Sequence, residues 1–219
     1  MTKSLQRIDA AAFLNSHDNY VILTHVRPDG DTLGSASALC LGLRSLGKTA
    51  HVLVNPGVSQ RYGWMVEGLT VEEAGKDDTV VSTDVASPGM LPENAKPYLG
   101  RVALRIDHHG SATSFSDLEL VDPDSASCAE VVFDVLENMN WRRSPQVLDR
   151  VYVGLSTDTG CFRFANTTAR TFRVAAACAE GGARVYELNQ VLFETNTLGK
   201  LRMQGWIVEH MRLLHCGSM

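Results

Sequence analysis

The segment Val102–Ile106 is a short, largely apolar run that ends in Asp107, His108 and His109, with Gly110 directly behind them. A run of this length, followed by a turn signal, predicts a buried strand. Open α/β sheets bind their ligands at the carboxyl ends of such strands, which is where a carboxylate and two imidazoles are expected here. Because adjacent residues on extended backbone point in opposite directions, one imidazole is expected to bind a metal and the other to face substrate.

Three further element ends carry the same kinds of side chain. Two predicted strands, Tyr20–Thr24 and Thr79–Thr83, are each followed by acids, and the first also by a histidine. A predicted helix opens at Pro145 and ends within Ser156–Gly160, where another acid lies. The residues presented in this way are His25, Asp29, Asp31, Asp84 and Asp158. Each of them taken alone is an ordinary turn or cap residue, but their recurrence at four element ends favours a shared site.

The order of the predicted elements favours an α/β fold. Asp31 or Thr32 is expected to cap a helix of small residues that stops at Gly47, and a strand over Thr49–Val54 follows. This βαβ order predicts a parallel, doubly wound sheet flanked by helices. The other expected elements are a helix over Asp9–Ser16, a strand over Arg101–Ile106, a helix behind a Ser127–Glu130 capping box, a strand-like turn over Cys161–Phe164, a helix capped by Asn166–Thr168, and helices over Arg184–Phe193 and Leu198–Leu214.

Charge and cysteine usage narrow the classes of function. The net charge is -5 at pH 7 and no run of Lys or Arg occurs, which argues against binding of long duplex nucleic acid by charge alone. The five cysteines show no CxxC spacing, so they are expected to be reduced thiols in a cytoplasmic protein. No signal peptide is apparent at the N-terminus, and no apolar run reaches the ~18–20 residues of a membrane span. The cysteines are Cys40, Cys128, Cys161, Cys178 and Cys216.

The convergence of several carboxylates predicts a metal site. Carboxylates gathered in one place raise each other's pKa, and cations remove that repulsion. A mixture of carboxylate and imidazole ligands suits Mn²⁺, Fe²⁺ or Zn²⁺ better than Ca²⁺. This number of ligands indicates two ions about 3.5–4 Å apart that share a carboxylate.

These motifs resemble the signature of the DHH phosphoesterase superfamily. The superfamily includes RecJ exonucleases, cyclic-dinucleotide phosphodiesterases and family II inorganic pyrophosphatases. Residues 158–168 and 192–195 are most similar to the NrnA group, oligoribonucleases that also act as phosphatases on adenosine 3',5'-bisphosphate. The matching motifs are His25-x-x-Pro28-Asp29-Gly30-Asp31, Asp84, Asp107-His108-His109 and Asp158-Thr159-Gly160.

The resemblance implies a role for each of these residues. Both divalent ions are expected to be Mn²⁺, with Mg²⁺, Fe²⁺ or Zn²⁺ as alternatives. One ion would be held by His25, Asp29 and Asp84. The other would be held by Asp31, Asp84, His108 and Asp158, with Asp84 bridging. In catalysis, Asp107 would orient a ligand histidine and His109 would face the scissile phosphate. Arg163 and Asn166 lie just beyond the last ligand, where they are expected to contact phosphate.

The resemblance also implies the domain organisation and the substrates. Residues 1–195 are expected to form the DHH-type domain and residues 196–219 a connector helix. Members of the group carry a second domain with a Gly-rich, His-containing segment that clasps substrate, and no Gly-Gly-Gly-His run occurs here. The expected function is hydrolysis of short oligoribonucleotides, and of adenosine 3',5'-bisphosphate to AMP and phosphate. A homodimer would be compatible with this function. The alternatives are a cyclic-dinucleotide phosphodiesterase, a pyrophosphatase, and a nucleotide- or metal-binding module without turnover.

Overall fold

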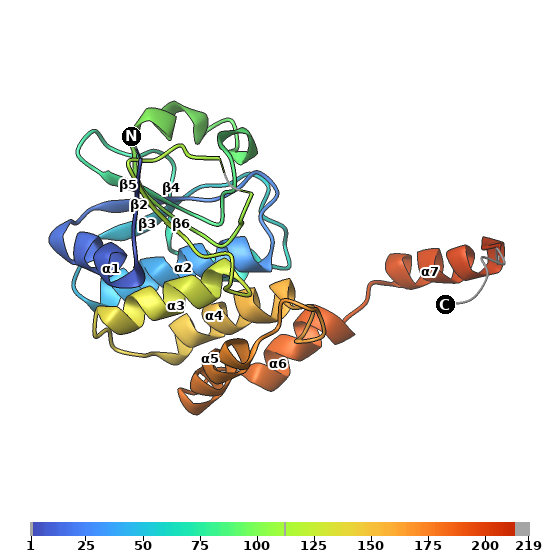
Figure 1. Ribbon diagram of the computed structural model, residues 1–219. Helices are drawn as coiled ribbons and strands as arrows, with labels where there is room; N and C mark the ends of the chain where they lie inside the picture. The colour runs from blue at the N-terminus through green and yellow to red at the C-terminus, as the bar shows by residue number, and fades with distance from the viewer. Residues whose placement is uncertain (1, 112, 213–219) are drawn as a thin grey trace. The chain divides into compact units, whose positions relative to one another are not determined.

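The structure is a computed structural model that describes residues 2–111 and 113–212. Within these residues seven strands form one sheet in the order β1-β7-β6-β5-β2-β3-β4, and every neighbouring pair is parallel (Figure 1). The strands are β1 (Lys3–Ser4), β2 (Tyr20–Leu23), β3 (Ala50–Leu53), β4 (Thr70–Val71), β5 (Thr79–Thr83), β6 (Val102–Asp107) and β7 (Leu118–Val121). The fold is therefore α/β with a parallel sheet, as the sequence predicts.

The first two α-helices alternate with the first strands, and the described elements after β7 are all helical. The chain divides into two compact units, Met1–Val185 and Tyr186–Met219. The α-helices are α1 (Arg7–Ser16), α2 (Gly30–Ser45), α3 (Cys128–Asn138), α4 (Pro145–Asp158), α5 (Ala169–Glu180), α6 (Val185–Asn189) and α7 (Leu198–His210). Shorter helical segments are the 3₁₀ turns Gly63–Met65, Pro88–Met90 and Lys96–Arg101 and the π-helical turn Gln190–Glu194. The second unit consists of helical segments, and Thr197 caps α7 through its side chain.

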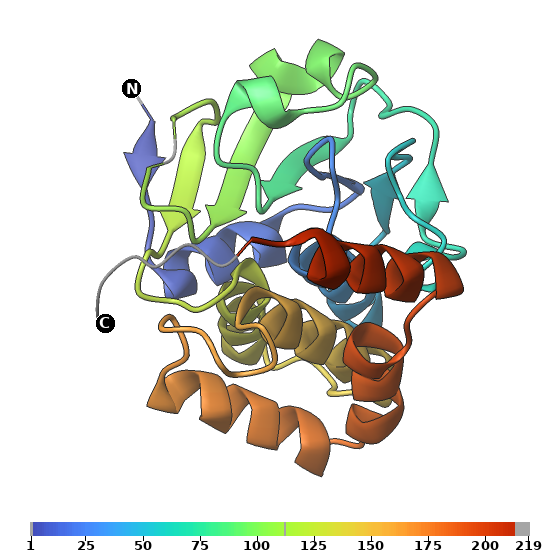
Figure 2. The ribbon, with the colours of Figure 1, turned by 90° about the vertical axis from the view of Figure 1, so that its right-hand side faces the viewer.

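In the first unit, helices cover both faces of the sheet. Helices α2 and α3 pack against one face, and α4 packs on α2 and α3 as a further layer (Figure 1). The 3₁₀ turns Pro88–Met90 and Lys96–Arg101 cover the other face, and the same layering is seen from a second direction (Figure 2). The core on that other face includes Leu23, Val80 and Leu91. Because both faces are covered, strand β2 has all of its residues buried, which explains its continuous apolar sequence.

Two glycines allow α2 and α4 to approach closely. A Cβ on Gly34 would lie 2.6 Å from the carbonyl oxygen of Arg150. A Cβ on Gly154 would lie 2.5 Å from the Cβ of Ala129 and 2.7 Å from Oδ1 of Asp31. Gly34 therefore allows α2 to approach the backbone of α4, and Gly154 allows α4 to approach the side chains of Ala129 and Asp31.

Several local predictions are confirmed and several are wrong. Helix α1, strand β5 and the caps Ser127 and Thr168 lie where they are expected. The cap of α2 is Asp29 rather than Asp31 or Thr32, because its Oδ1 accepts hydrogen bonds from both of their backbone N–H groups. Helix α4 ends at Asp158, within the predicted range, whereas the predicted strand-like turn over 161–164 is a turn without strand pairing.

Other differences concern short or terminal elements. Strands β1, β4 and β7 were not predicted, because two to four residues carry too little hydrophobic pattern to identify a strand. Helix α7 ends at His210, and the last two residues of the helix predicted to Leu214 lie outside the described residues. Cys216 also lies outside them, and the four cysteines that the structure describes are free thiols. Among the described helices, none combines the length and the apolar character that crossing a membrane requires.

The register of the central strands aligns their carboxyl ends. Leu23 on β2 is level with Ser82 on β5, and Thr83 is level with Ile106 on β6. The residues that follow these strands therefore emerge at one edge of the sheet, which is the edge where ligands bind in this class of fold.

Candidate metal centre

The loop after β2 presents a histidine and the cap of α2. Asp29 has its Oδ2 4.0 Å from Nε2 of His25, while its Oδ1 holds the first turn of the helix. Asn55 donates from Nδ2 to the backbone carbonyl of His25 at 2.8 Å. The hydroxyl of Thr32 contacts Nε2 of His25 and donates to Oδ2 of Asp84 at 2.6 Å. The imidazole is thereby fixed between two carboxylates.

Asp84 lies at the centre of the cluster. Its backbone is in the left-handed region, with φ of 58°, a conformation that Asp tolerates better than most residues. Its Oδ2 is 3.7 Å from Nε2 of His25, and its Oδ1 is 3.6 Å both from Nε2 of His108 and from Nδ1 of His109. Among the described residues, no donor forms a hydrogen bond to this buried Oδ1. An orphaned, buried carboxylate oxygen between two imidazoles is a position that suits a cation.

The two adjacent imidazoles lie on the same side of the site, so the prediction that they point in opposite directions is wrong. Strand β6 ends at Asp107, and the chain leaves extended geometry at His108. The two rings are tilted against each other with centroids 4.5 Å apart. Alternation applies only within extended backbone, and it ends where the strand ends.

His108 points its Nε2 at three carboxylates. This nitrogen lies 3.3 Å from Oδ2 of Asp158, 3.6 Å from Oδ1 of Asp84 and 3.8 Å from Oδ2 of Asp31. Its Nδ1 lies 3.3 Å from the carbonyl oxygen of Ser125, so Nδ1 carries the proton and donates it there. That hydrogen bond fixes the tautomer that leaves Nε2 free as a ligand.

His109 and Asp107 form a separate pair. Oδ1 of Asp107 accepts hydrogen bonds from Nδ1 of His109 at 2.8 Å and from the backbone N–H groups of both histidines. Asp107 is fully buried, whereas the side chain of His109 is 40% exposed. The pairing engages Nδ1, so Nε2 is the ring nitrogen of His109 that remains available to a ligand. The residue that Asp107 orients through its side chain is therefore His109, not His108.

Asp31 and Asp158 complete the cluster from two helices. Oδ2 and Oδ1 of Asp31 accept hydrogen bonds from the backbone N–H groups of Cys128 (2.6 Å) and Ala129 (2.9 Å), at the N-terminus of α3. The partial positive charge of a helix N-terminus stabilises the ionised carboxylate there. The side chains of Asp29 and Asp158 are 57% and 29% exposed, against 1% for Asp31, so the cluster opens to solvent at Asp29 and Asp158.

Burial and mutual repulsion shift the pKa values of these groups. Burial, and then the neighbouring carboxylates Asp84 and Asp158, raise the pKa of Asp31 well above 3.8. The pKa values of Asp84 and Asp158 are also raised, mainly by burial. Burial lowers the pKa of His25, so its neutral form, which ligates metals, is favoured. The raised pKa values of the three carboxyl groups describe a site in which buried negative charge lacks a positive partner.

The donor set fits metal ions. Three groups of side chains each offer ligand atoms that lie within 4.8 Å of one another. The groups are His25, Asp29 and Asp84; Asp31, His108 and Asp158; and Asp84, His108 and His109. The six residues expected as metal ligands are therefore gathered in one place, and Asp84 belongs to two of the groups.

Arg163 and Asn166 lie in the loop that follows α4. Arg163 is exposed, and its Nε donates to the carbonyl oxygen of Gly160 at 2.6 Å. Asn166 donates from Nδ2 to the carbonyl oxygens of Ala126 (3.0 Å) and Asp158 (3.2 Å), so it ties the loop to the last ligand.

Two residues that support the site were missed by the sequence analysis. Thr32 connects His25 with Asp84, as described above. Arg105 is 1% exposed inside β6; it pairs with Oε2 of Glu119 at 3.1 Å and donates to the carbonyl oxygens of Thr113 and Ala86. The sequence signal that could have identified Arg105 is its charge within an apolar strand. It lies two positions before Asp107 and therefore on the same face of the strand.

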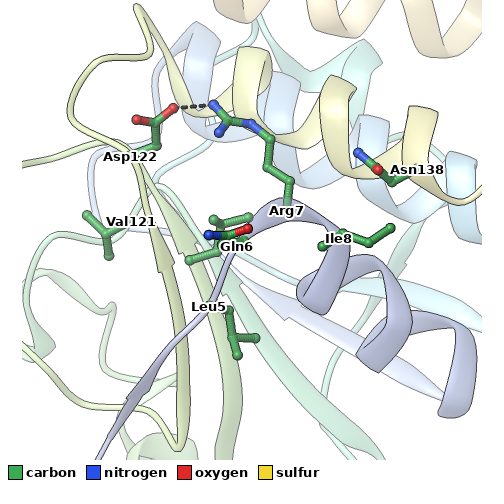
Figure 3. A pocket seen from close by; sticks show the side chains of 8 residues that line it. Leu5, Gln6, Arg7, Ile8, Val121, Asp122 and Asn138 are labelled. Atoms are coloured by element: carbon green, nitrogen blue, oxygen red, sulfur yellow. Dashed lines mark hydrogen bonds and ion pairs between the residues drawn. The ribbon is translucent and has the colours of Figure 1, made fainter.

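A separate pocket of about 460 Å³ lies where β1 joins α1 and β7 ends (Figure 3). Arg7 points toward Asp122 and forms an ion pair with it. Both charges in this pocket are thus paired, and it contributes no candidate ligand. The donor set, rather than the depth of a cavity, identifies the candidate centre.

Comparisons with known proteins agree with this geometry. The family model described as "DHH family, N-terminal domain" matches residues 19–155. The chain is 37% identical over 173 residues to the bifunctional oligoribonuclease and PAP phosphatase NrnA of Thermus thermophilus, covering 78% of this chain and 52% of the relative. It is 27% identical over 213 residues to the protein of the same name from Bacillus subtilis, covering 94% of this chain and 66% of the relative. The chain thus spans between half and two thirds of these relatives.

A solved structure has the same fold. The crystal structure of an exopolyphosphatase-related protein from Bacteroides fragilis superimposes with a TM-score of 0.80 at 23% identity. The match covers 95% of this chain and 66% of that one. At this identity the likeness establishes the fold and nothing finer.

Proposed function

The chain belongs to the DHH family, and from that premise we propose that its centre holds two divalent metal ions and hydrolyses phosphoester bonds. The observation that carries the proposal is the buried, orphaned Oδ1 of Asp84 between the imidazoles of His108 and His109. One ion is assigned to His25, Asp29 and Asp84. The other is assigned to Asp31, Asp84, His108 and Asp158. The mixed imidazole and carboxylate donors support Mn²⁺ as the preferred ion.

The bound ions would neutralise the charge of the phosphate. They would also lower the pKa of a bound water, so that hydroxide is available to attack the phosphate near neutral pH. The chain's own residues bind and orient the substrate. His109, held by Asp107 through Nδ1, presents Nε2 to the scissile phosphate or to the proton that moves in the reaction. Arg163 contributes positive charge at the open side of the cluster, and Asn166 contacts phosphate through its Oδ1 while its Nδ2 fixes the loop.

The proposed substrates are short oligoribonucleotides and adenosine 3',5'-bisphosphate. The names of the Thermus and Bacillus relatives support this choice. A cytoplasmic location forms part of the proposal, supported by the free thiols of the four described cysteines. The division into a DHH-type domain over residues 1–195 and a connector over residues 196–219 also belongs to it.

The test combines metal content with turnover. After incubation with Mn²⁺, elemental analysis of the folded chain should find two ions, and His109→Ala should keep both. The same variant should lose on the order of 10²–10⁴-fold in the rate of hydrolysis of 4-nitrophenyl phosphate, the usual contribution of a positioned acid–base group. His51→Ala, on strand β3, is the matched control and should retain both metal and activity.

Three results would contradict the proposal. Folded protein that binds no divalent ion rules out the metal centre. Two bound ions without hydrolysis of the small ester or of adenosine 3',5'-bisphosphate would support a binding module without turnover. An unchanged rate in His109→Ala would remove the role given to that residue.

A further inference from the structure

The loop after Asp158 has an unusual backbone. Gly160, Cys161 and Phe162 follow one another in the left-handed region, with φ of 55°, 59° and 62°. For residues other than glycine this conformation is unfavourable and persists only where the surroundings enforce it. The enforcing contacts include the hydrogen bonds from the N–H of Cys161 to the carbonyl of Ser156 (2.6 Å) and from the N–H of Phe164 to the carbonyl of Thr159 (3.0 Å). The chain therefore curls back on itself directly behind the last ligand.

The curl places the ring of Phe164 flat against Gly160. The ring atoms Cζ, Cε1 and Cε2 all lie within 2.6 Å of the point where a Cβ on Gly160 would sit. Nearly equal distances to three consecutive ring atoms mean that this point lies over the face of the ring, since an edge-on contact would place the two Cε atoms much farther away. One face of the ring thus rests on glycine backbone, and the side chain is 57% exposed.

Packing explains the other aromatic residues nearby but not the exposure of Phe164. Phe162 lies between Tyr152 and Phe172, with ring centroids 6.0 Å and 5.5 Å away. Phe172 is also exposed, at 54%, but it stacks on Phe162. Phe164 has an open face on a loop that hydrogen bonds hold in place. A rigid loop that exposes a flat apolar ring is typical of a surface that receives another flat ring.

We propose that Phe164 is a stacking platform for the nucleobase of a nucleotide whose phosphate binds at the adjacent metal centre. The inference rests on the proposed function and adds the base to what this chain recognises. Gly160, which supports the ring, is two residues from Asp158, so their Cα atoms are at most about 7.6 Å apart. The side chain of Asp158 is 29% exposed, so the cluster is accessible to solvent at the start of this loop. A phosphate and a base joined by one ribose can span such a separation.

A nucleobase fits this platform better than an apolar protein segment does. On the loop, Phe164 is preceded by Arg163 and followed, after the small Ala165, by Asn166, and both of these polar residues are exposed. Every base has a π-face, so stacking on one ring tolerates any sequence. The platform therefore predicts recognition of nucleotides as a class without a strong preference among bases.

The experiment compares AMP with ribose 5-phosphate, which carries the same phosphate and sugar and lacks the base. In the full chain with Mn²⁺, AMP should bind more tightly than ribose 5-phosphate, measured by calorimetry. Phe164→Ala should weaken AMP binding roughly 5- to 100-fold, the range expected for one stacked base, and leave ribose 5-phosphate unchanged. Phe164→Tyr should restore AMP binding, because it keeps the ring.

Phe172→Ala is the matched control, an equally exposed phenylalanine on α5. It should leave the preference for AMP intact. Phe164→Trp supplies a spectroscopic readout, since AMP should quench the added indole fluorescence relative to the parent chain and ribose 5-phosphate should not. Equal losses for both ligands in Phe164→Ala, or no loss for either, would overturn the platform. So would a lower melting temperature without a change in the AMP preference, which would make Phe164 a packing residue.

The two proposals fail in different ways. A parent chain that binds no Mn²⁺ and hydrolyses no phosphoester overturns the proposed function. A parent chain that does both, while Phe164→Ala retains the full preference for AMP over ribose 5-phosphate, overturns only the platform.

Discussion

His109 donates a hydrogen bond from Nδ1 to Oδ1 of Asp107 at 2.8 Å, and the side chain of His109 is 40% exposed whereas that of Asp107 is fully buried. This hydrogen bond from His109, together with the charges of nearby carboxylates and against the opposing effect of burial, raises the pKa of His109 from 6.5 to about 9. Burial acts to raise the pKa of Asp107, but the bonds from His109 and His108 outweigh it and lower that pKa below 3.8. Between pH 6.5 and about 9, the folded pair therefore holds a proton that the unfolded chain releases.

The first prediction concerns the pH dependence of stability in the metal-free protein. Because the folded pKa of His109 lies above its ordinary value, its contribution is complete below pH 6.5 and disappears as the pH rises through about 9. The difference in free energy of unfolding between the parent chain and His109→Gln should accordingly shrink between these pH values. Urea unfolding near pH 6 and near pH 10 measures it. A difference that stays constant or grows with pH would contradict the assignment.

The second prediction is that Asp84→Asn stabilises the metal-free chain. The pKa of Asp84 is raised mainly by burial, so its ionised form is unfavourable in the fold at neutral pH. Asparagine removes that charge and keeps an oxygen that can accept from Thr32. The melting temperature without metal should rise, while the further rise that Mn²⁺ produces in the parent chain should be lost.

Asp122→Asn is the control with the opposite sign. Burial opposes ionisation of Asp122, but its bonds from Ser125 and Arg7 prevail and lower its pKa below 3.8. Neutralising this residue should lower the melting temperature of the metal-free protein and leave the response to Mn²⁺ unchanged. If both variants move the melting temperature in the same direction, charge repulsion at Asp84 is not the cause.

The third prediction uses Gly154. A Cβ there would meet Ala129 and Oδ1 of Asp31, so Gly154→Ala should destabilise the chain by roughly 1–3 kcal/mol and also displace the proposed ligand Asp31. Weaker Mn²⁺ binding is expected in addition to a lower free energy of unfolding. Gly42→Ala, whose Cβ would lie 2.5 Å from Cδ2 of Leu136, should cost stability alone. Equal Mn²⁺ affinity in the two variants would show that the approach of α4 does not set the position of Asp31.

The fourth prediction concerns the buried ion pair of Arg105. Arg105→Met leaves Glu119 without its buried cation, which should cost about 3–5 kcal/mol in urea unfolding. The double variant Arg105→Met with Glu119→Met should recover part of that loss, because an apolar pair replaces an ionic one, while the carbonyl oxygens of Thr113 and Ala86 lose their donor in both variants. Arg143→Met breaks an exposed pair with Glu137 and should cost at most about 1 kcal/mol. A double variant as unstable as the single one would contradict the pairing.

Local sequence signals predicted the fold class and the members of the site because each signal acts over a few residues. The apolar runs that became β2, β5 and β6 fixed which residues follow a strand. Parallel pairing then brings those ends to one edge, so His25, Asp84 and His108 could be grouped before any coordinates were known. The cap of α2 was predicted two or three residues too late, at Asp31 or Thr32, because Asp and Thr are both good caps and only the hydrogen bonds identify Asp29.

Tertiary structure alone decided how these groups act on one another. The carboxylate of Asp31 is held by backbone N–H groups 97 and 98 residues away, and no local pattern encodes such a contact. The orientation of the two imidazoles depends on where β6 stops and on Ser125, which belongs to another segment. The burial that raises the pKa of Asp84 exists only once the surrounding strands and helices have excluded water. The sequence by itself determined which donors are available, and packing determined which atoms face one another, because that depends on contacts between distant parts of the chain.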